Sequence, residues 1–532
     1  MSGGRGETAA HEPERKAFSI SRVEKVDLLF VVDNSNSMFG EQASLRAQLP
    51  RLMDVLTRGE RGPDDPHPFT PVRDLHVGVV STDMGIPGVE FPSGNCHADG
   101  GDDGRLQHTP RPDPATGLTC DASYPAFLSF SAEQDPAQVA HDFACVAALG
   151  TGGCGFEQQL EAGFKALWPR DYVDADGKLV MPNPYRFIAT TEEGTWGRGD
   201  TPEAQGGNRG FLRPDSLLVV VLLTDEEDCS VNHTDHLRPN NQLPQDSPYR
   251  MQDINLRCHY NKQFLYDVRV RYLNGLRKLR PGREDLVVFS AIAGVPPDLV
   301  SQEVLQAVDF SDAASRDAFF DAILADPRMQ GTIDPLSQPG TGQGNITPSC
   351  TRTLADGSVS TAYPPRRLVE LAKGFGANGM VQSICQDDFM RAFDSIIETM
   401  AKPLTEMCMV EQLQREADGR VDCKLFWELP PAALRTSNLT PVRCEELGEL
   451  VEPGAPVQLT AAGGERCEIR QLTVSAGQPS AGKGWYYDDF TPDLDRMCAG
   501  NLSRRIAFAD GARAPQGASV KLECSGDAAA EP

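Results

Sequence analysis

The 532-residue sequence lacks any apolar run long enough to cross a membrane, which takes about 20 residues. Its N-terminus, MSGGRGETAAHEPERKAFSI, also lacks the apolar stretch that a signal peptide requires. Basic residues are scarce: 50 Lys and Arg stand against 76 Asp and Glu, and the formal net charge is −26. Since such a charge repels nucleic acid and anionic membrane surfaces, we expect no nucleic-acid partner. The lack of a long apolar run predicts no transmembrane segment.

Common catalytic signatures are absent as well. The sequence contains no H-E-x-x-H, no G-x-S-x-G and no G-x-G-x-x-G after an apolar strand. We therefore expect that the protein is not an enzyme. Catalytic triads assemble from distant residues, so a hydrolase with a site among the long insertions stays open as a third hypothesis.

The sequence has no CxxC metal pair, yet it contains 14 cysteines at dispersed positions. This pattern predicts disulfides and an oxidising compartment. We expect an exported protein of the cell envelope or extracellular space, with a signal or lipid anchor upstream of Met1. The alternative is a cytosolic protein with free thiols. Cys96–Cys120 and Cys229–Cys258 bracket insertions and are suggested as pairs, and closeness in sequence suggests Cys145–Cys154, although sequence does not determine connectivity.

What the chain does contain is a buried strand that ends in oxygen ligands. The apolar run Val26–Val32 is typical of the centre of a parallel sheet. Asp33, Ser35 and Ser37 follow it at alternate positions. Carboxylate and hydroxyl oxygens are hard donors that suit Mg²⁺, Mn²⁺ or Ca²⁺. The alternative is an N-cap, because Asp and Ser also accept backbone N–H bonds at the start of a helix.

A second apolar strand, 216–223, ends in Thr224 and Asp225. The strings VDLLFVVDNSNSM and LLTDEEDCS together resemble the metal-ion-dependent adhesion site of von Willebrand factor type A domains. The resemblance implies that Ser35 and Ser37 bind the ion directly, and that Asp33 and Asp225 bind it directly or through water. It also implies an open position for the carboxylate of a protein partner.

The loop at residues 150–157 matches the second metal loop of type A domains along the chain, is named the third loop of the site here, and departs from the family. Type A domains place a Thr before a helix in a Gly-Gly-Thr context, and Cys154 occupies that position in Gly150–Glu157. A thiol is a poor Mg²⁺ ligand, so Thr151 or Glu157 could supply the missing oxygen, or the coordination is incomplete. With GGCGFEQQLEA included, residues 22–401 are similar to cysteine-rich type A proteins and lipoproteins of myxobacteria.

The order of the predicted elements favours an α/β fold with a doubly wound, mostly parallel sheet of the type A or Rossmann-like kind. We expect a disordered segment over 1–21, a type A domain with long insertions over 22–401, and a cysteine-rich β domain over 402–532. The insertions lie around 85–125, 170–214, 230–258 and 327–365. The remaining elements are predicted as strands at 74–82, 127–130, 286–293 and 380–384, and helices at 41–56, 136–149, 156–168, 261–279 and 389–400.

Two hypotheses follow for the function. The first is a cell-envelope protein for adhesion or protein binding, in which Mg²⁺, or Mn²⁺ or Ca²⁺, engages an acidic group of a partner. The alternative is a structural envelope protein braced by disulfides, in which the metal site is vestigial because Cys154 has replaced the threonine.

Overall fold

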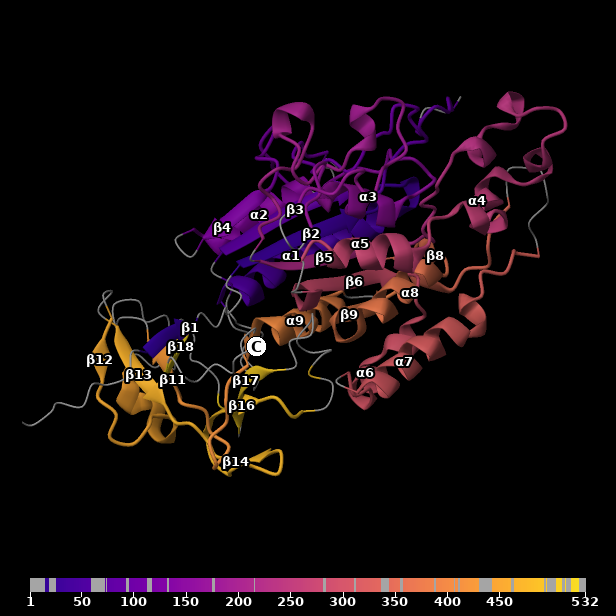
Figure 1. Ribbon diagram of the computed structural model, residues 1–532. Coiled ribbons are helices and arrows are strands. Elements are labelled where there is room, and N and C mark those ends of the chain that lie inside the picture. The colour runs from indigo at the N-terminus through magenta and orange to yellow at the C-terminus, as the bar shows by residue number, and fades with distance from the viewer. Residues whose placement is uncertain are drawn as a thin grey trace, which may run out of the picture. The chain divides into compact units, whose positions relative to one another are not determined.

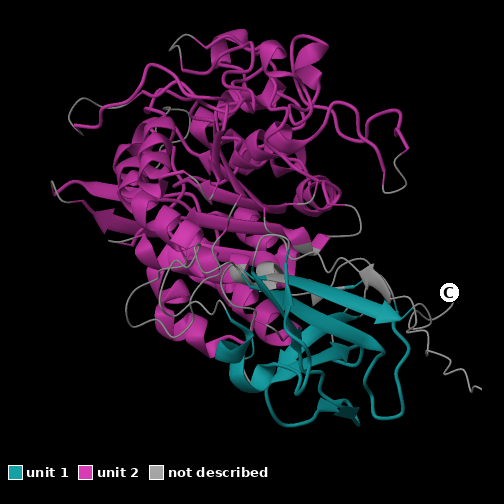
Figure 2. Ribbon diagram, turned by 90° about the vertical axis from the view of Figure 1, so that its left-hand side faces the viewer, with its two compact units in different colours: residues 1–22, 405–532 teal, residues 23–404 magenta. Residues whose placement is uncertain are grey.

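The structure is a computed structural model of the chain. It describes residues 15–18, 25–58, 72, 74–91, 95–111, 117–131, 134–174, 178–214, 216–280, 284–310, 312–335, 344–354, 357–386, 389–405, 407–409, 412–429, 443–460, 464–491, 494, 504–509, 512 and 518–525. The chain forms two compact units (Figure 2): Val23–Leu404 and, separately, Met1–Arg22 with Thr405–Pro532. No helix among these residues is both long and apolar enough to span a membrane.

The larger unit is an α/β structure built on a six-stranded sheet (Figure 1). The strand order is β4-β3-β2-β5-β6-β9. Of the pairings described in this sheet, β3–β4 is antiparallel and the other four are parallel. The bounds are β2 Lys25–Val32, β3 Asp74–Ser81, β4 Leu128–Ser131, β5 Leu217–Leu223, β6 Val287–Ala293 and β9 Gly379–Ser383.

Helices cover both faces of this sheet. Alternate residues of a strand point to opposite faces, and Phe30 and Val31 of β2 accordingly belong to two different hydrophobic clusters. One face carries α1 Phe39–Arg58, α2 Pro136–Val146 and α9 Met390–Thr405. The other carries α3 Gln159–Leu167, α5 Asn274–Arg277, α7 Ala313–Ala325 and α8 Arg366–Phe375. The predicted mostly parallel α/β sheet is therefore confirmed.

The main departures from the predicted elements lie after β5. The helix predicted over 261–279 is broken into a π-helix, Val268–Leu273, and the short α5. Between β6 and β9 the chain forms α6 Gln302–Ala307, the helices α7 and α8, and a hairpin of β7 Cys350–Thr353 with β8 Val359–Ala362. None of these elements was predicted from the sequence except helical structure in general between strands. Helix α9 also runs beyond the boundary predicted at 401–402.

The smaller unit is rich in antiparallel strands, as predicted for 402–532. One sheet has the order β1-β18-β11-β13-β12, a second β10-β17-β16, and a third pairs β14 with β15. The bounds are β1 Arg15–Phe18, β10 Met407–Cys408, β11 Cys423–Glu428, β12 Gln458–Leu459, β13 Glu465–Ile469, β14 Val474–Ser475, β15 Gln478–Pro479, β16 Gly484–Asp488, β17 Arg505–Ala509 and β18 Ser519–Ser525. Residues 1–21 were predicted to be disordered, but Arg15–Phe18 forms β1, which pairs with β18. The rest of residues 1–21 lies outside the described residues.

Six disulfides join described cysteines. They are Cys96–Cys154, Cys120–Cys145, Cys229–Cys258, Cys350–Cys385, Cys423–Cys524 and Cys444–Cys467. The predicted pair Cys229–Cys258 is confirmed, whereas Cys96–Cys120 and Cys145–Cys154 are wrong. The insertion folds back so that each of these four cysteines meets a more distant partner, which spacing along the chain does not reveal. Cys498 lies outside the described residues.

A buried charge network anchors the start of β2. Asp27 is fully buried. The backbone N–H and Nε of Arg213 donate to its two carboxylate oxygens, at 2.6 and 2.8 Å. The hydroxyl of Ser216 also donates to this carboxylate, and the buried guanidinium of Arg280 lies 3.8 Å away. The network joins the first central strand to the segment that leads into β5.

We predict that Asp27→Ala lowers the free energy of unfolding by about 3–5 kcal/mol, because it leaves two guanidinium groups without their buried counter-charge. The matched control is Asp74→Ala. Asp74 also pairs with Arg213, but its side chain is 45% exposed, so the loss should stay below about 1 kcal/mol. Urea denaturation of the oxidised proteins measures both, and equal losses would contradict the role given to Asp27.

Candidate functional site

Loops from three neighbouring strands meet at the carboxyl edge of the central sheet. The parallel pairing of β2 with β5 places Val32 beside Leu223, so the residues that follow each strand emerge together. The segment 150–158 binds both neighbouring loops: Gly153 N–H donates to Asn34 O at 2.9 Å, and Gln158 N–H donates to Thr82 O at 3.2 Å. Ligands bind at this edge in open α/β sheets.

Hydrogen bonds hold the carboxylate of Asp33 in place. Its Oδ1 accepts from the backbone N–H of Ser35 at 2.8 Å and from the hydroxyl of Thr82 at 3.4 Å. Its Oδ2 accepts from the hydroxyl of Thr224 at 2.6 Å. Asp33 is fully buried, and this burial raises its pKa, while the hydrogen bond from Thr224 opposes the rise. Hydrogen bonds from Ser35, Thr82 and Thr224, rather than a Lys or Arg side chain, therefore position this carboxylate.

The two serines of the motif lie side by side. The hydroxyl oxygens of Ser35 and Ser37 are 3.1 Å apart. Adjacent ligands of an octahedral Mg²⁺ lie about 3.0 Å apart, since each metal–oxygen bond is about 2.1 Å long. Ser35 is buried and Ser37 is exposed. The pair thus presents two hydroxyl oxygens at the spacing of neighbouring cation ligands, at a point that solvent reaches.

Asp225 is the least satisfied polar group at this edge. It is 1% exposed, and no donor reaches either of its carboxylate oxygens with normal hydrogen-bond geometry, although Ser37 lies nearby. Burial and the nearby carboxylate of Asp33 raise its pKa to about 8, a shift that the neighbouring Ser37 opposes. An unpaired buried carboxylate is costly, so Asp225 needs a proton or a cation.

Two glutamates add to the negative charge. Glu157 is 7% exposed, and burial together with Asp33 raises its pKa well above the usual range. Burial and the proximity of Glu157 raise the pKa of Glu226 in the same way. No Lys or Arg in the described part of the chain forms an ion pair with these glutamates, Asp33 or Asp225. The cluster therefore lacks a positive charge of its own and suits a divalent cation.

The four predicted ligands Asp33, Ser35, Ser37 and Asp225 fall at this one edge of the sheet, and Glu157 lies close to the two aspartates. Cys154 is bonded to Cys96 and so has no free thiol for a metal. Among described residues, no three His, Cys, Asp or Glu side chains are arranged to hold a metal by themselves. A cation at this edge would therefore need the serine hydroxyls.

Sequence reasoning missed the residues that orient the ligands. Besides Thr82 and Thr224, the amide of Gln42 donates to Asp33 O and to Gly150 O, both at 2.9 Å, and so joins the first and third loops. The signal for Thr224 was its place directly before Asp225. Gln42 gave no signal, since it lies on the first turns of a helix whose partners come from distant segments.

The unanticipated β7–β8 hairpin packs beside the site. The hydroxyl of Ser360 donates to the buried carboxylate of Glu41 at 2.5 Å, and Arg352 pairs with the same oxygen at 3.3 Å. The backbone N–H of Tyr363, just after the hairpin, donates to Asp225 O at 2.8 Å. The hairpin thus fixes one side of the loop that carries Asp225.

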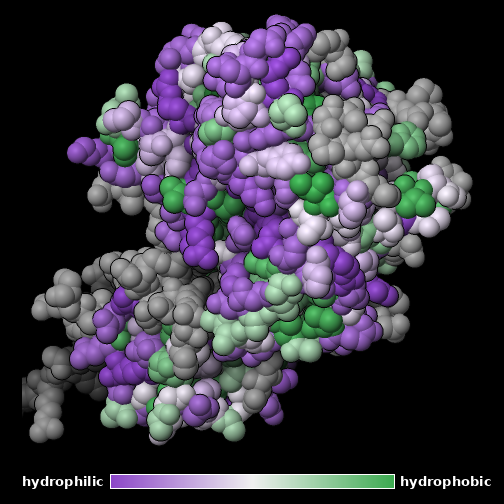
Figure 3. Space-filling model, turned by 90° about the vertical axis from the view of Figure 1, so that its right-hand side faces the viewer, coloured by the Kyte–Doolittle hydropathy of each residue, from purple (hydrophilic) through white to green (hydrophobic). Residues whose placement is uncertain are grey.

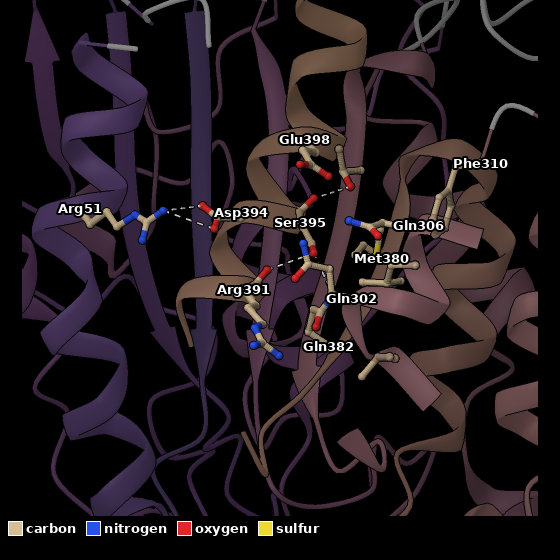
Figure 4. Close-up of a pocket in the computed structure, with 13 residues that line it drawn as sticks. Arg51, Gln302, Gln306, Phe310, Met380, Gln382, Arg391, Asp394, Ser395 and Glu398 are labelled. Carbon is tan, nitrogen blue, oxygen red and sulfur yellow. Dashed lines mark hydrogen bonds and ion pairs between the residues drawn. The ribbon is translucent and has the colours of Figure 1, made fainter. Parts of the chain in front are cut away.

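A separate concavity lies away from the cluster of buried carboxylates. A cavity of about 710 Å³ is bounded by α6, β9 and α9 (Figure 4). Its buried polar groups satisfy one another: the amide of Gln382 donates to Ser395 Oγ at 2.9 Å, and Thr399 donates to Ser395 O at 2.8 Å. It therefore lacks the unsatisfied buried charge that marks the first site.

The face in Figure 3 is mainly hydrophilic, with small, separate groups of apolar residues.

No protein-family model matches this chain, and no curated protein sequence matches it either.

We predict that the cation-free protein becomes less stable as the pH rises from about 4 to 8. The pKa of Asp225 is raised from 3.8 to about 8, so in this range the folded state holds a proton that the unfolded state has released, and ionisation opposes folding. Relative to Asp225→Asn, the wild type should lose up to about 4 kcal/mol between pH 5 and 8. Denaturation in EDTA measures this difference, and a constant difference would contradict the prediction.

Proposed function

We propose that the unit Val23–Leu404 is a von Willebrand factor type A domain that binds a divalent cation and, through it, an acidic group of a protein partner. The observation that carries the proposal is Asp225, a buried carboxylate with neither oxygen bonded, beside Asp33 and a pair of serine hydroxyls. The parallel order of the central strands and the antiparallel β4 at one edge support the fold assignment.

The residues fit a cation of the Mg²⁺, Mn²⁺ or Ca²⁺ class. Ser35 and Ser37 would bind it directly, since their hydroxyls lie at ligand spacing. Asp33 and Asp225 would neutralise its charge directly or through water. Such an ion retains exchangeable waters, and the cation would thus supply a position for a partner's carboxylate.

The third loop would contribute through Glu157 rather than Cys154. The backbone carbonyl of Glu157 accepts from Cys229 N–H at 2.9 Å, and Gln158 N–H binds the loop after β3. Residue 157 is thereby held between the loops of two strands, with a buried side chain near Asp33. Thr151 lies earlier in this loop and makes no described contact with the cluster.

Export to the cell envelope or extracellular space is part of the proposal. Six disulfides between described cysteines support an oxidising compartment. In the same proposal the protein binds a partner through the cation and is not an enzyme.

A second candidate function is structural, with a vestigial metal site. The observation that favours it is the Cys96–Cys154 disulfide, which removes the third-loop residue from any coordination. This candidate predicts the same braced fold without a response to divalent ions.

We predict that millimolar Mg²⁺, Mn²⁺ or Ca²⁺ raises the melting temperature of the oxidised protein above its value in EDTA, because the ion binds only the folded state. Asp33→Ala should abolish the rise. The matched control Asp174→Ala changes a half-buried carboxylate distant in the sequence from Asp33 and Asp225 and should retain the rise. A melting temperature that no ion changes would favour the structural candidate.

We also predict that Glu157→Gln raises the stability of the protein in EDTA, since it removes a buried uncompensated carboxylate, yet weakens cation binding about tenfold or more. Isothermal titration with each ion measures the second effect. Cation affinity unchanged in Glu157→Gln but lost in Asp33→Ala would show that the third loop contributes no ligand.

A further inference from the structure

A groove between α6 and α9 lies apart from the buried carboxylates at the carboxyl edge of the sheet. Its volume of about 710 Å³ lies within the range of ligand-binding clefts, about 300–1,000 Å³. The side chains that line it come from α6, α9, the outer strand β9 and flanking segments (Figure 4). All of them belong to the unit Val23–Leu404, and none is one of the buried carboxylates or serines of the first site.

Four of the side chains that line the groove are apolar. Val300 and Met380 are buried, whereas Leu305 and Phe310 are only half-buried although they pack against the core. The half-exposed pair leaves apolar surface that a ligand side chain could cover. Burial of such surface provides the non-directional part of binding.

Two exposed amides provide the directional part. Gln302 and Gln306 lie one turn apart on α6, and both side chains line the groove. Residues four apart on a helix are separated by about 6 Å along its axis. An extended peptide presents backbone amides on the same side at about 6.8 Å, every second residue. Each glutamine carries both a donor and an acceptor, and the two could therefore bind successive peptide groups of one extended chain.

Charges of opposite sign mark the two ends. Arg391 and Glu398 line the groove from α9 and are both exposed. They lie seven residues apart, which corresponds to about 10 Å along the helix. This distance equals about three residues of an extended chain. Between them, the Arg51–Asp394 pair, with an N···O distance of 3.1 Å, borders the same wall.

We propose that this groove binds an extended peptide segment of a partner protein, with an acidic group at the Arg391 end, a basic group at the Glu398 end and an apolar side chain between them. The amides of Gln302 and Gln306 hold the peptide backbone, and Leu305, Phe310 and Met380 receive the apolar side chain. The site does not depend on the cation, so its occupancy is independent of the function proposed above.

The test uses the oxidised full-length protein in EDTA and two fluorescent hexapeptide libraries. Both libraries have apolar residues at the third and fourth positions. One is basic at its second position and acidic at its fifth, about three residues apart as the separation of Arg391 and Glu398 requires, and the other has neutral residues at these two positions. We expect the charged library to yield ligands, and the neutral one to yield binders at least about tenfold weaker.

Variants of exposed side chains then locate the contact. Gln302→Ala combined with Gln306→Ala should weaken the selected peptides about tenfold or more, while Gln205→Ala, a change of an exposed glutamine elsewhere, should leave them unchanged. Arg391→Glu should reverse the charge preferred at the acidic end, an effect that a general loss of folding cannot produce. Equal melting temperatures of the variants check the fold.

Two outcomes would overturn the proposal. One is that neither library yields a ligand for the wild-type protein. The other is that the ligands bind Arg391→Glu and the double glutamine variant as tightly as the wild type. Failure of either kind leaves the cation site untouched, because the assay contains no divalent ion.

Discussion

Negative charge buried at the carboxyl edge of the central sheet is the constraint on which the α/β unit depends. Asp33 and Asp225 follow two strands that pair in parallel, so the backbone ladder itself brings their carboxylates together. Burial and mutual repulsion both oppose ionisation. Hydrogen bonds stabilise the carboxylate of Asp33, whereas the carboxylate of Asp225 accepts no hydrogen bond of normal geometry. This residual need supports the proposed cation at this edge over a helix cap alone.

The surrounding segments serve to hold this charge in place. The third loop is tied to the first by the amide of Gln42 and to an insertion by the Cys96–Cys154 disulfide. The β7–β8 hairpin satisfies Glu41 on the other side. These contacts come from distant parts of the chain. The long insertions therefore help to hold the loops of the site in position.

The two proposed recognition sites rely on different physics. The cation site offers concentrated, desolvated charge, and one carboxylate of a partner suffices to use it. The groove beside α9 offers modest charges in solvent, exposed amides and half-covered apolar side chains. Such contacts are individually weak, so recognition there depends on the spacing of several groups along an extended chain. The two sites can therefore serve separate features of one partner or of two partners.

By itself, the sequence determined the α/β architecture, the strand at 127–130, the β-rich smaller unit and the proposed ligand motif at Asp33, Ser35, Ser37 and Asp225. Each of these depends on local apolar periodicity or on what directly follows a strand. Only the tertiary structure decided the partners of Cys96 and Cys154, the role of Gln42, the β7–β8 hairpin and the groove beside α9. These arise from contacts between segments far apart in the chain, and local patterns of hydrophobicity carry no record of which distant segment each side chain meets.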